Sequence, residues 1–257
     1  MHLKELSNES SNYSSPLIKP DAHYTPQPES WEALGFKDSD DYTEWQIKAT
    51  VDDLVEVYHD HPYEFATDFC YTLNVEENAY QLLPRDKPHI KDNFKVYHRL
   101  PKGCIYTLCS SREMQKSASA ACFIVHQLGM TTNNHGVWSS INEDHAIYIL
   151  EEYIESILKQ LPIPYPSWRK TGNQIVVEDL GNSITAVARG ATQITGHHLS
   201  YWFADEYSKI EPHKEQVRVY REGTPALRYG KVFILSTPVA ETYFEFLMTG
   251  RKIDDRS

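Results

Sequence analysis

The sequence has no apolar run long enough to cross a membrane. Its longest uninterrupted apolar runs, such as "ACFIV" at 121–125 and "VFIL" at 232–235, are short, whereas a membrane-spanning helix needs about 20 apolar residues. The first residues also lack the positively charged segment and apolar core of a secretory signal. We therefore expect a globular protein with no membrane partner, and its 257 residues can bury a substantial core.

Cysteines are few and are not spaced for metal binding. Cys70, Cys104, Cys109 and Cys122 show no paired CxxC spacing. Three of them fall in or beside an apolar stretch that should belong to the core. We therefore expect buried, reduced thiols rather than a metal site, as is usual for a protein that works in a cytosol.

Positive charge is also scarce. The chain has 25 Lys and Arg against 36 Asp and Glu, which gives a formal net charge of −11. This balance argues against a protein that coats nucleic acid by itself, because the phosphate backbone is negative. Contact with DNA through a small basic patch, or only within an assembly, stays compatible with it.

The amino-acid composition of the chain changes near residue 41. Residues 1–40 are rich in Ser, Asn, Pro, Asp and Glu and poor in aliphatic residues, which predicts a flexible arm. Beyond them, apolar residues at spacings of three and four predict helices over 43–59 and 63–73, with Pro62 between them. The domains that we expect are an arm at 1–40, one main domain at 41–250 (a helical part at 41–100 and a core at 101–250) and a tail or linker at 251–257.

From residue 104 onward, short apolar runs alternate with helical segments, which is typical of parallel β/α units. The expected strands are 104–109, 136–141, 173–179, 183–189, 199–206 and 231–237. The expected helices are 116–130, 143–161 and a less regular one near 212–227. The pattern predicts an α/β fold with a mostly parallel central sheet flanked by helices.

The stretch "CSSREMQKSASAA", 109–121, places Lys116 and Ser117 where a phosphate-binding loop has Lys-Ser, but it lacks both glycines of the pattern GxxxxGK[ST]. Ser110 and Gln115 stand at the glycine positions. A strand before the loop and a helix after it favour a nucleotide site, because backbone N–H groups at a helix start surround phosphates. Gln115 must then adopt a glycine-like backbone or reshape the loop. The alternative is a surface Lys-Ser at an ordinary helix start.

Two further strands end in polar residues. "LSYWFADE" delivers Asp205 and Glu206 at the end of an apolar strand, where one acid can hold magnesium and the next can activate water. "KVFILSTPV" ends in Ser236 and Thr237, at the sheet edge where ligands of open α/β sheets bind. An acid pair at a strand end is common by chance, and Pro238 alone can explain why the second strand ends. Together with the loop at 110–117, however, the two strand ends favour a nucleotide site.

These residues resemble the ATPase domain of the large terminase subunit, the DNA-packaging motor of tailed bacteriophages. The resemblance covers roughly 62–250 and is carried by "SSREMQKS", "LSYWFADE" and "ILSTP". The family writes its loop like S-R-Q-x-G-K-S, from which this chain departs at Glu113 and Gln115. The resemblance implies a RecA-like (ASCE) P-loop NTPase fold with an N-terminal helical extension.

The resemblance also implies roles for individual residues. Lys116 and Ser117 would bind phosphates within a loop that also includes Ser110, Ser111, Arg112 and Gln115. Ser117 and Asp205 would hold Mg, Glu206 would activate water, Arg112 would approach the γ-phosphate, and Ser236 and Thr237 would couple hydrolysis to movement. Arg189 or Arg169, offered to a neighbouring subunit, is the alternative to Arg112. Asp86 stands where the family often has an adenine-binding glutamine.

The activity implied is Mg-dependent ATP hydrolysis that translocates double-stranded DNA into a procapsid. The implied partners are double-stranded DNA, a portal protein, a small terminase subunit and further copies in a homo-oligomeric ring, all in the host cytoplasm. The family's nuclease domain is not expected on this chain, which stops at Ser257. Two alternatives stay open: a helicase-like DNA translocase, and a degenerate P-loop module with a structural or docking role, which Glu113 and Gln115 favour.

Overall fold

The computed structural model describes residues 50–74, 79–111, 114–188, 199–224 and 230–250. The expected arm at 1–40, the expected tail at 251–257 and the start of the helix expected at 43–59 lie outside these residues. Arg112, Glu113 and Arg189 also lie outside them.

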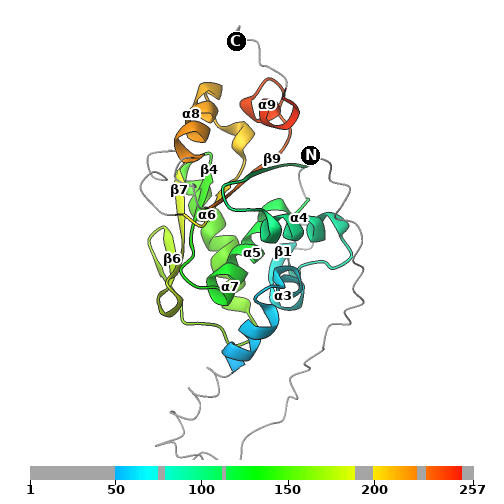
Figure 1. Ribbon diagram of the computed structural model, residues 1–257, viewed down its shortest axis with the longest axis vertical. Helices are drawn as coiled ribbons and strands as arrows, with labels where there is room; N and C mark the ends of the chain where they lie inside the picture. The colour runs from blue at the N-terminus through cyan, green and yellow to red at the C-terminus, as the bar shows by residue number, and fades with distance from the viewer. Residues whose placement is uncertain (1–49, 75–78, 112–113, 189–198, 225–229, 251–257) are drawn as a thin grey trace, which may run out of the picture. The chain divides into compact units, whose positions relative to one another are not determined.

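A seven-stranded sheet forms the centre of the molecule, with the strand order β3-β9-β8-β4-β7-β6-β5 (Figure 1). The pairs from β3 to β7 are parallel, whereas β6 pairs antiparallel with both β7 and β5. The expectation of a mostly parallel sheet is therefore confirmed. The strands are β3 (Ile105–Cys109), β4 (His135–Ser140), β5 (Arg169–Thr171), β6 (Gln174–Val177), β7 (Asn182–Ala188), β8 (Tyr201–Ala204) and β9 (Lys231–Ser236).

Helices cover both faces of this sheet (Figure 1). Along β8 and β9, Phe203 and Phe233 face a cluster that includes Phe123 of α5, while Trp202 and Ile234 belong to a second cluster with residues of α8 and α9. Because alternate side chains of a strand point to opposite faces, strands buried on both faces read as continuous apolar runs. The helices are residues 50–58, α3 (Pro62–Phe69), α4 (Pro88–Arg99), α5 (Lys116–Met130), α6 (Glu143–Ile149), α7 (Ser156–Gln160), α8 (His213–Gly223) and α9 (Tyr243–Thr249).

The helix expected at 63–73 is wrong in its second part. α3 ends at Phe69, and Cys70 takes an extended backbone with φ −87° and ψ 116°. The next residues form β1 (Tyr71–Asn74), which pairs antiparallel with β2 (Ala79–Leu82). Short apolar segments of this kind do not distinguish a helix end from a strand by their spacing. β1, β2, α4, β5 and α9 were not predicted.

The helix expected at 143–161 is interrupted by a π-helical segment, Leu150–Glu155, between α6 and α7. The N–H of Ser156 donates to the carbonyl of Glu151, five residues earlier, which is the π pattern. Ile149 before this segment, Leu150 within it and Ile157 after it are all buried. A count of apolar spacings alone does not reveal this insertion.

The sheet order brings the predicted motifs to one edge. β3, β9 and β8 are neighbours and run parallel, so the segments that follow them meet at the carboxyl ends of the strands. β9 lies between the strand that precedes the loop and the strand that precedes the acid pair. None of the described helices is long and apolar enough to cross a membrane.

Candidate nucleotide-binding site

The loop before α5 contains a residue in the left-handed backbone region. Gln115, directly before the helix, has φ 52° and ψ 32°, a conformation that glycine adopts without steric cost. For another residue the cost is about 1–2 kcal/mol. Gln115 therefore keeps the backbone that the glycine of the usual pattern would take. The sequence left two possibilities open, a glycine-like backbone at Gln115 or a reshaped loop, and the structure has the first.

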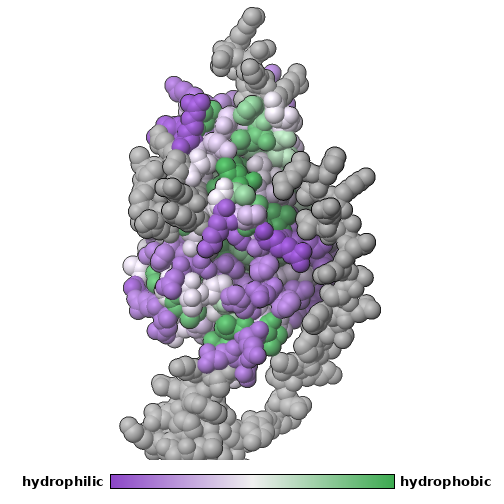
Figure 2. Space-filling model, in the orientation of Figure 1, coloured by the Kyte–Doolittle hydropathy of each residue, from purple (hydrophilic) through white to green (hydrophobic). Residues whose placement is uncertain are grey.

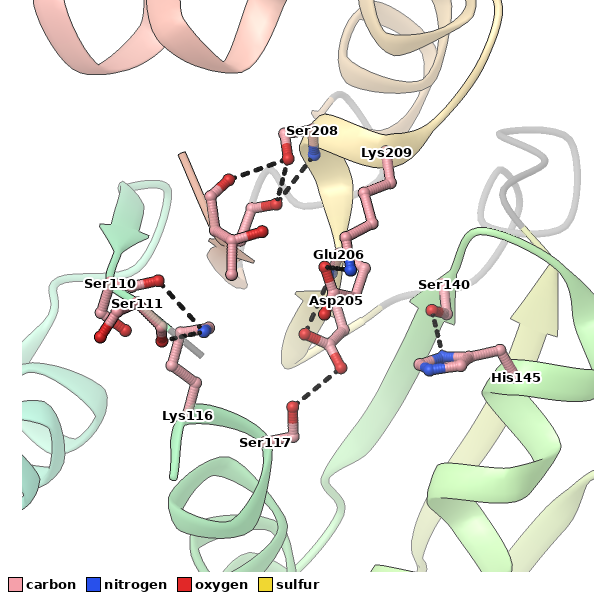
Figure 3. A network of polar contacts seen from close by, with 12 residues as sticks. Ser110, Ser111, Lys116, Ser117, Ser140, His145, Asp205, Glu206, Ser208 and Lys209 are labelled. Atoms are coloured by element: carbon pink, nitrogen blue, oxygen red, sulfur yellow. Dashed lines mark hydrogen bonds and ion pairs between the residues drawn. The ribbon is translucent and has the colours of Figure 1, made fainter. Parts of the chain in front are cut away.

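Lys116 begins α5 and is folded back over the loop. Its Nζ donates hydrogen bonds to the carbonyls of Ser110 at 3.3 Å and Ser111 at 3.0 Å (Figure 3). Burial lowers the pKa of Lys116, although the nearby Asp205 and Glu206 act in the opposite direction. The side chain thus holds a positive charge above the loop, next to the first N–H groups of α5.

Ser117 and Asp205 are in direct contact across the site. Ser117 Oγ donates to Asp205 Oδ2 at 2.9 Å (Figure 3), and the N–H of Asp205 donates to the carbonyl of Ser139 in β4 at 2.9 Å. Burial raises the pKa of Asp205 to about 6, and the Ser117 hydrogen bond lowers it in part. A hydroxyl and a carboxylate oxygen side by side fit a hard cation such as Mg²⁺, which would also favour the ionised carboxylate.

Glu206 is held by its backbone and by one lysine. It has φ 52° and ψ 34°, a second left-handed residue in the site, and its N–H donates to Asp205 Oδ1 at 3.0 Å. Its Oε2 lies 2.7 Å from Lys209 Nζ. Backbone strain of this kind collects at functional sites when the surrounding structure holds it in place.

Ser236 and Thr237 connect the end of β9 with the turn that follows the acid pair. Ser236 Oγ accepts from the N–H of Ser208 at 3.0 Å and lies 2.7 Å from Ser208 Oγ. Ser208 Oγ also donates to the carbonyl of Thr237 at 2.9 Å. The N–H of Ser110 donates to the carbonyl of Ser236 at 3.2 Å. The predicted coupling residues therefore contact both the loop and the acid-pair turn.

A buried glutamine extends this contact to the outer helices. Gln216 of α8 donates through Nε2 to the carbonyls of Ser208 and Ile210 at 3.1 and 3.0 Å, and its Oε1 accepts from the N–H of Phe244 in α9 at 3.3 Å. The sequence did not identify Ser208 or Gln216. No spacing rule would have found Gln216, because a single polar residue in an amphipathic helix has no distinctive pattern.

Ser140 and His145 were also missed by the sequence reasoning. Ser140 ends β4, the neighbour of β8, and its Oγ lies 2.7 Å from His145 Nδ1 in α6 (Figure 3). Burial lowers the pKa of His145, and the negative charge of Glu206 raises it in part. The available signal was a polar residue at the end of a parallel strand, the same signal that identified Ser236.

Other predicted residues lie away from these contacts or outside the described chain. Arg112 lies outside the described residues. Arg169 lies on β5, at the opposite edge of the sheet from β3, where it binds Glu178 through Nε at 2.8 Å. Asp86 is exposed in the turn before α4. A cavity of about 540 Å³ over β4, β7 and β6 is lined by Arg169 and by residues such as Gln174 and Thr185, but by none of the residues predicted to bind nucleotide or metal.

No protein-family model and no curated protein matches the chain. Among solved structures, the HK97 bacteriophage large terminase aligns with a TM-score of 0.55 at 13% sequence identity, over 69% of this chain and 37% of that one. The chain shares the fold of the aligned part of this large terminase. It spans well under half the length of the HK97 protein, and the expected resemblance and RecA-like fold are confirmed at the level of the fold.

Two further similar structures are less closely superimposed. The large terminase ATPase domain of Thermus phage P74-26 aligns with a TM-score of 0.47 at 19% identity, over 66% of this chain and 72% of that one. A DEAD box protein from Methanococcus jannaschii aligns with a TM-score of 0.40 at 13% identity, over 73% of this chain and 55% of that one.

Proposed function

We propose that residues 41–250 are the ATPase motor domain of a terminase large subunit, which hydrolyses ATP with Mg and translocates double-stranded DNA into a procapsid. The observation that carries this proposal is the hydrogen bond from Ser117 Oγ to Asp205 Oδ2 at 2.9 Å. It joins the end of the loop to the acid pair, two elements far apart in the sequence, at the carboxyl edge of the sheet. Phosphate binding and water activation need these two elements in contact.

The phosphates are bound by the loop 110–117. The N–H groups at the start of α5 and the ammonium group of Lys116 supply positive charge, and Lys116 exchanges the carbonyls of Ser110 and Ser111 for phosphate oxygens. Ser117 and Asp205 would hold Mg, which would neutralise part of the charge that develops on the phosphates. Arg112 adds a further cation to the γ-phosphate.

Hydrolysis proceeds by attack of water on the γ-phosphorus. The water oxygen forms a bond to phosphorus, and the bond to the oxygen that bridges the β- and γ-phosphates breaks, so ADP leaves. Glu206 accepts the proton of the attacking water and later releases it. Catalysis comes from positioning and electrostatic support, because this reaction requires no covalent intermediate with the protein.

Movement is transmitted through Ser236 and Thr237. Their contacts with Ser208 connect the end of β9 to the turn after the acid pair, and Gln216 connects that turn to α8 and α9. A shift of the acid-pair turn is therefore passed to these two helices. In the assembled motor, the partners are DNA, a portal protein, a small terminase subunit and further copies in a ring, in the host cytoplasm at the procapsid.

The test is magnesium-dependent phosphate release from the wild-type chain, Lys116→Ala and Glu206→Gln, with Lys214→Ala and Glu152→Gln as controls. The control residues are an exposed lysine and an exposed glutamate away from the site. We expect at least a 100-fold loss of turnover for both site variants, because each removes a charged group that acts in the transition state. Equal phosphate release from all five chains would refute the mechanism.

A degenerate, non-hydrolysing module is the second candidate function. It is favoured by the two hydrogen bonds of Lys116 to its own loop, since these compete with phosphate for the lysine. Calorimetry with ADP and with a non-hydrolysable ATP analogue, with and without magnesium, separates the two. Binding without turnover, in the presence of DNA as well, would favour the module.

A further inference from the structure

Lys209 is a second lysine close to the loop. It lies in the short 3-10 turn Tyr207–Lys209, directly after the acid pair. The pKa of Lys116 is lowered first by burial, and also by the positive charge of Lys209. Figure 3 shows the Lys209 side chain extending from this turn to Glu206. The two lysines therefore influence each other electrostatically from opposite sides of the site.

The contact of Lys209 with Glu206 occupies the oxygen on which catalysis depends. Lys209 Nζ lies 2.7 Å from Glu206 Oε2, which is buried and has no hydrogen-bond partner of normal geometry in the described part of the chain. A buried carboxylate oxygen is costly unless a cation neutralises it. In this state Lys209 supplies that charge, and the oxygen is not available to a water molecule.

Lys209 is also able to leave this position. Its side chain is 34% exposed and that of Glu206 21% exposed, and the flexible four-carbon chain of a lysine lets its ammonium group reach more than one anion. A γ-phosphate bound at the loop brings negative charge to the space between Lys116 and the acid pair. A γ-phosphate offers a stronger partner than a carboxylate, because the whole group carries about two negative charges rather than one.

We propose that Lys209 is a second phosphate-binding residue, which pairs with Glu206 in the nucleotide-free protein and moves to the γ-phosphate when ATP binds. The move frees Glu206 Oε2 to take the proton of the attacking water only when a γ-phosphate is present. ADP, which lacks that phosphate, leaves the Lys209–Glu206 ion pair intact. This inference rests on the proposed function, since it assigns a role in the same site.

The test compares the affinities of ADP and a non-hydrolysable ATP analogue, both with magnesium, for the wild type, Lys209→Ala and Lys209→Arg. We expect Lys209→Ala to weaken binding of the ATP analogue about tenfold, which is about 1.4 kcal/mol, and to change ADP affinity less than twofold. Lys209→Arg should restore most of the loss because it keeps the charge. Lys214→Ala is the matched control and should change neither affinity.

Glu206→Gln provides a second measurement. If Glu206 and the γ-phosphate compete for Lys209, Glu206→Gln should tighten binding of the ATP analogue several-fold in the wild-type background. In Lys209→Ala, the same substitution should have little effect, because the competing lysine is gone. An equal gain in both backgrounds would show general repulsion by Glu206 and would overturn the inference.

The outcomes distinguish this inference from the proposed function. If the wild-type chain binds neither nucleotide, both fail. If it binds both and Lys209→Ala weakens them equally, or not at all, only the inference fails. Thermal unfolding of each variant shows whether the fold is kept. If Lys209→Ala does not fold, Lys209→Gln replaces it, because it also removes the positive charge but keeps most of the side-chain length.

Discussion

Gln115 is a long side chain at a backbone position that favours glycine. Its φ of 52° accounts for how the loop forms without the expected glycine. The side chain adds a second cost, since its Oε1 is buried and has no hydrogen-bond partner among the residues that the structure describes. Both features should lower stability at the site.

Gln115→Gly should therefore stabilise the fold. Relative to Gln115→Ala, which also removes the amide but keeps a side chain in the left-handed region, we expect a free energy of unfolding higher by about 1 kcal/mol. Urea unfolding of the two variants measures the difference. An alanine variant as stable as the glycine variant would contradict the assignment of strain to this residue.

Asn182 stabilises a whole secondary-structure element: from the start of β7, it caps the C-terminal end of α5. Its Nδ2 donates to the carbonyl of Leu128 at 2.9 Å and to that of Thr131 at 2.5 Å, and its Oδ1 accepts from the N–H of Asn134 at 2.7 Å. The helix ends at Met130, and its C-cap residue is Thr131 in an extended conformation, not a glycine. The amide thus satisfies carbonyls that have no partner within a helix.

Asn182→Ala should lower the free energy of unfolding by about 3 kcal/mol, because it leaves the buried carbonyl of Leu128 and the partly buried carbonyl of Thr131 and N–H of Asn134 without this partner. Asn142→Ala is the comparison: this exposed residue caps α6 through one hydrogen bond, from the N–H of His145 at 2.7 Å, and its loss should cost about 1 kcal/mol. Chemical denaturation measures both. Equal losses would mean that the buried amide contributes no more than an ordinary cap.

At the scale of the whole molecule, two buried groups give stability opposite dependences on pH. His126 is buried, its Nε2 lies 2.7 Å from the carbonyl of Tyr58, and burial lowers its pKa from 6.5 to about 4. The folded state therefore loses stability as the pH falls from 6.5 to 4. The pKa of Asp205 is raised from 3.8 to about 6, so the folded state gains stability from this group as the pH falls through the same window.

Asp205→Asn tests how much Asp205 contributes to this pH dependence of stability. At pH 7.5 without magnesium, it removes a desolvated carboxylate and should raise the free energy of unfolding by up to about 3 kcal/mol. Between pH 6 and 4 this advantage should shrink, because wild-type Asp205 becomes protonated, so the two stability curves converge. Denaturation midpoints across this range measure the effect. The curve of stability against pH for the control Asp179→Asn, at an exposed residue, should stay parallel to that of the wild type. A parallel curve for Asp205→Asn would contradict the raised pKa of Asp205.

From residue 104 onward, the sequence predicted the strands of the sheet except β5, and the helices except α9, because the central strands such as β8 and β9 are buried on both faces and read as continuous apolar runs. It also predicted Lys116, Ser117, Asp205 and Ser236 as neighbours, since polar residues after parallel strands meet at one sheet edge. It failed at β1, β2 and β5, at α4 and α9, and at the π-helical segment. There, local spacing does not distinguish the alternatives.

The sequence by itself determined the chemistry of the site, because the residue types and their places after strands do not depend on how the sheet is assembled. Only the tertiary structure decided which of these groups touch. The contacts of Ser117 with Asp205 and of Ser208 with Ser236 depend on the position of β9 between β3 and β8. Strand order is set by packing between distant segments, which no local pattern records.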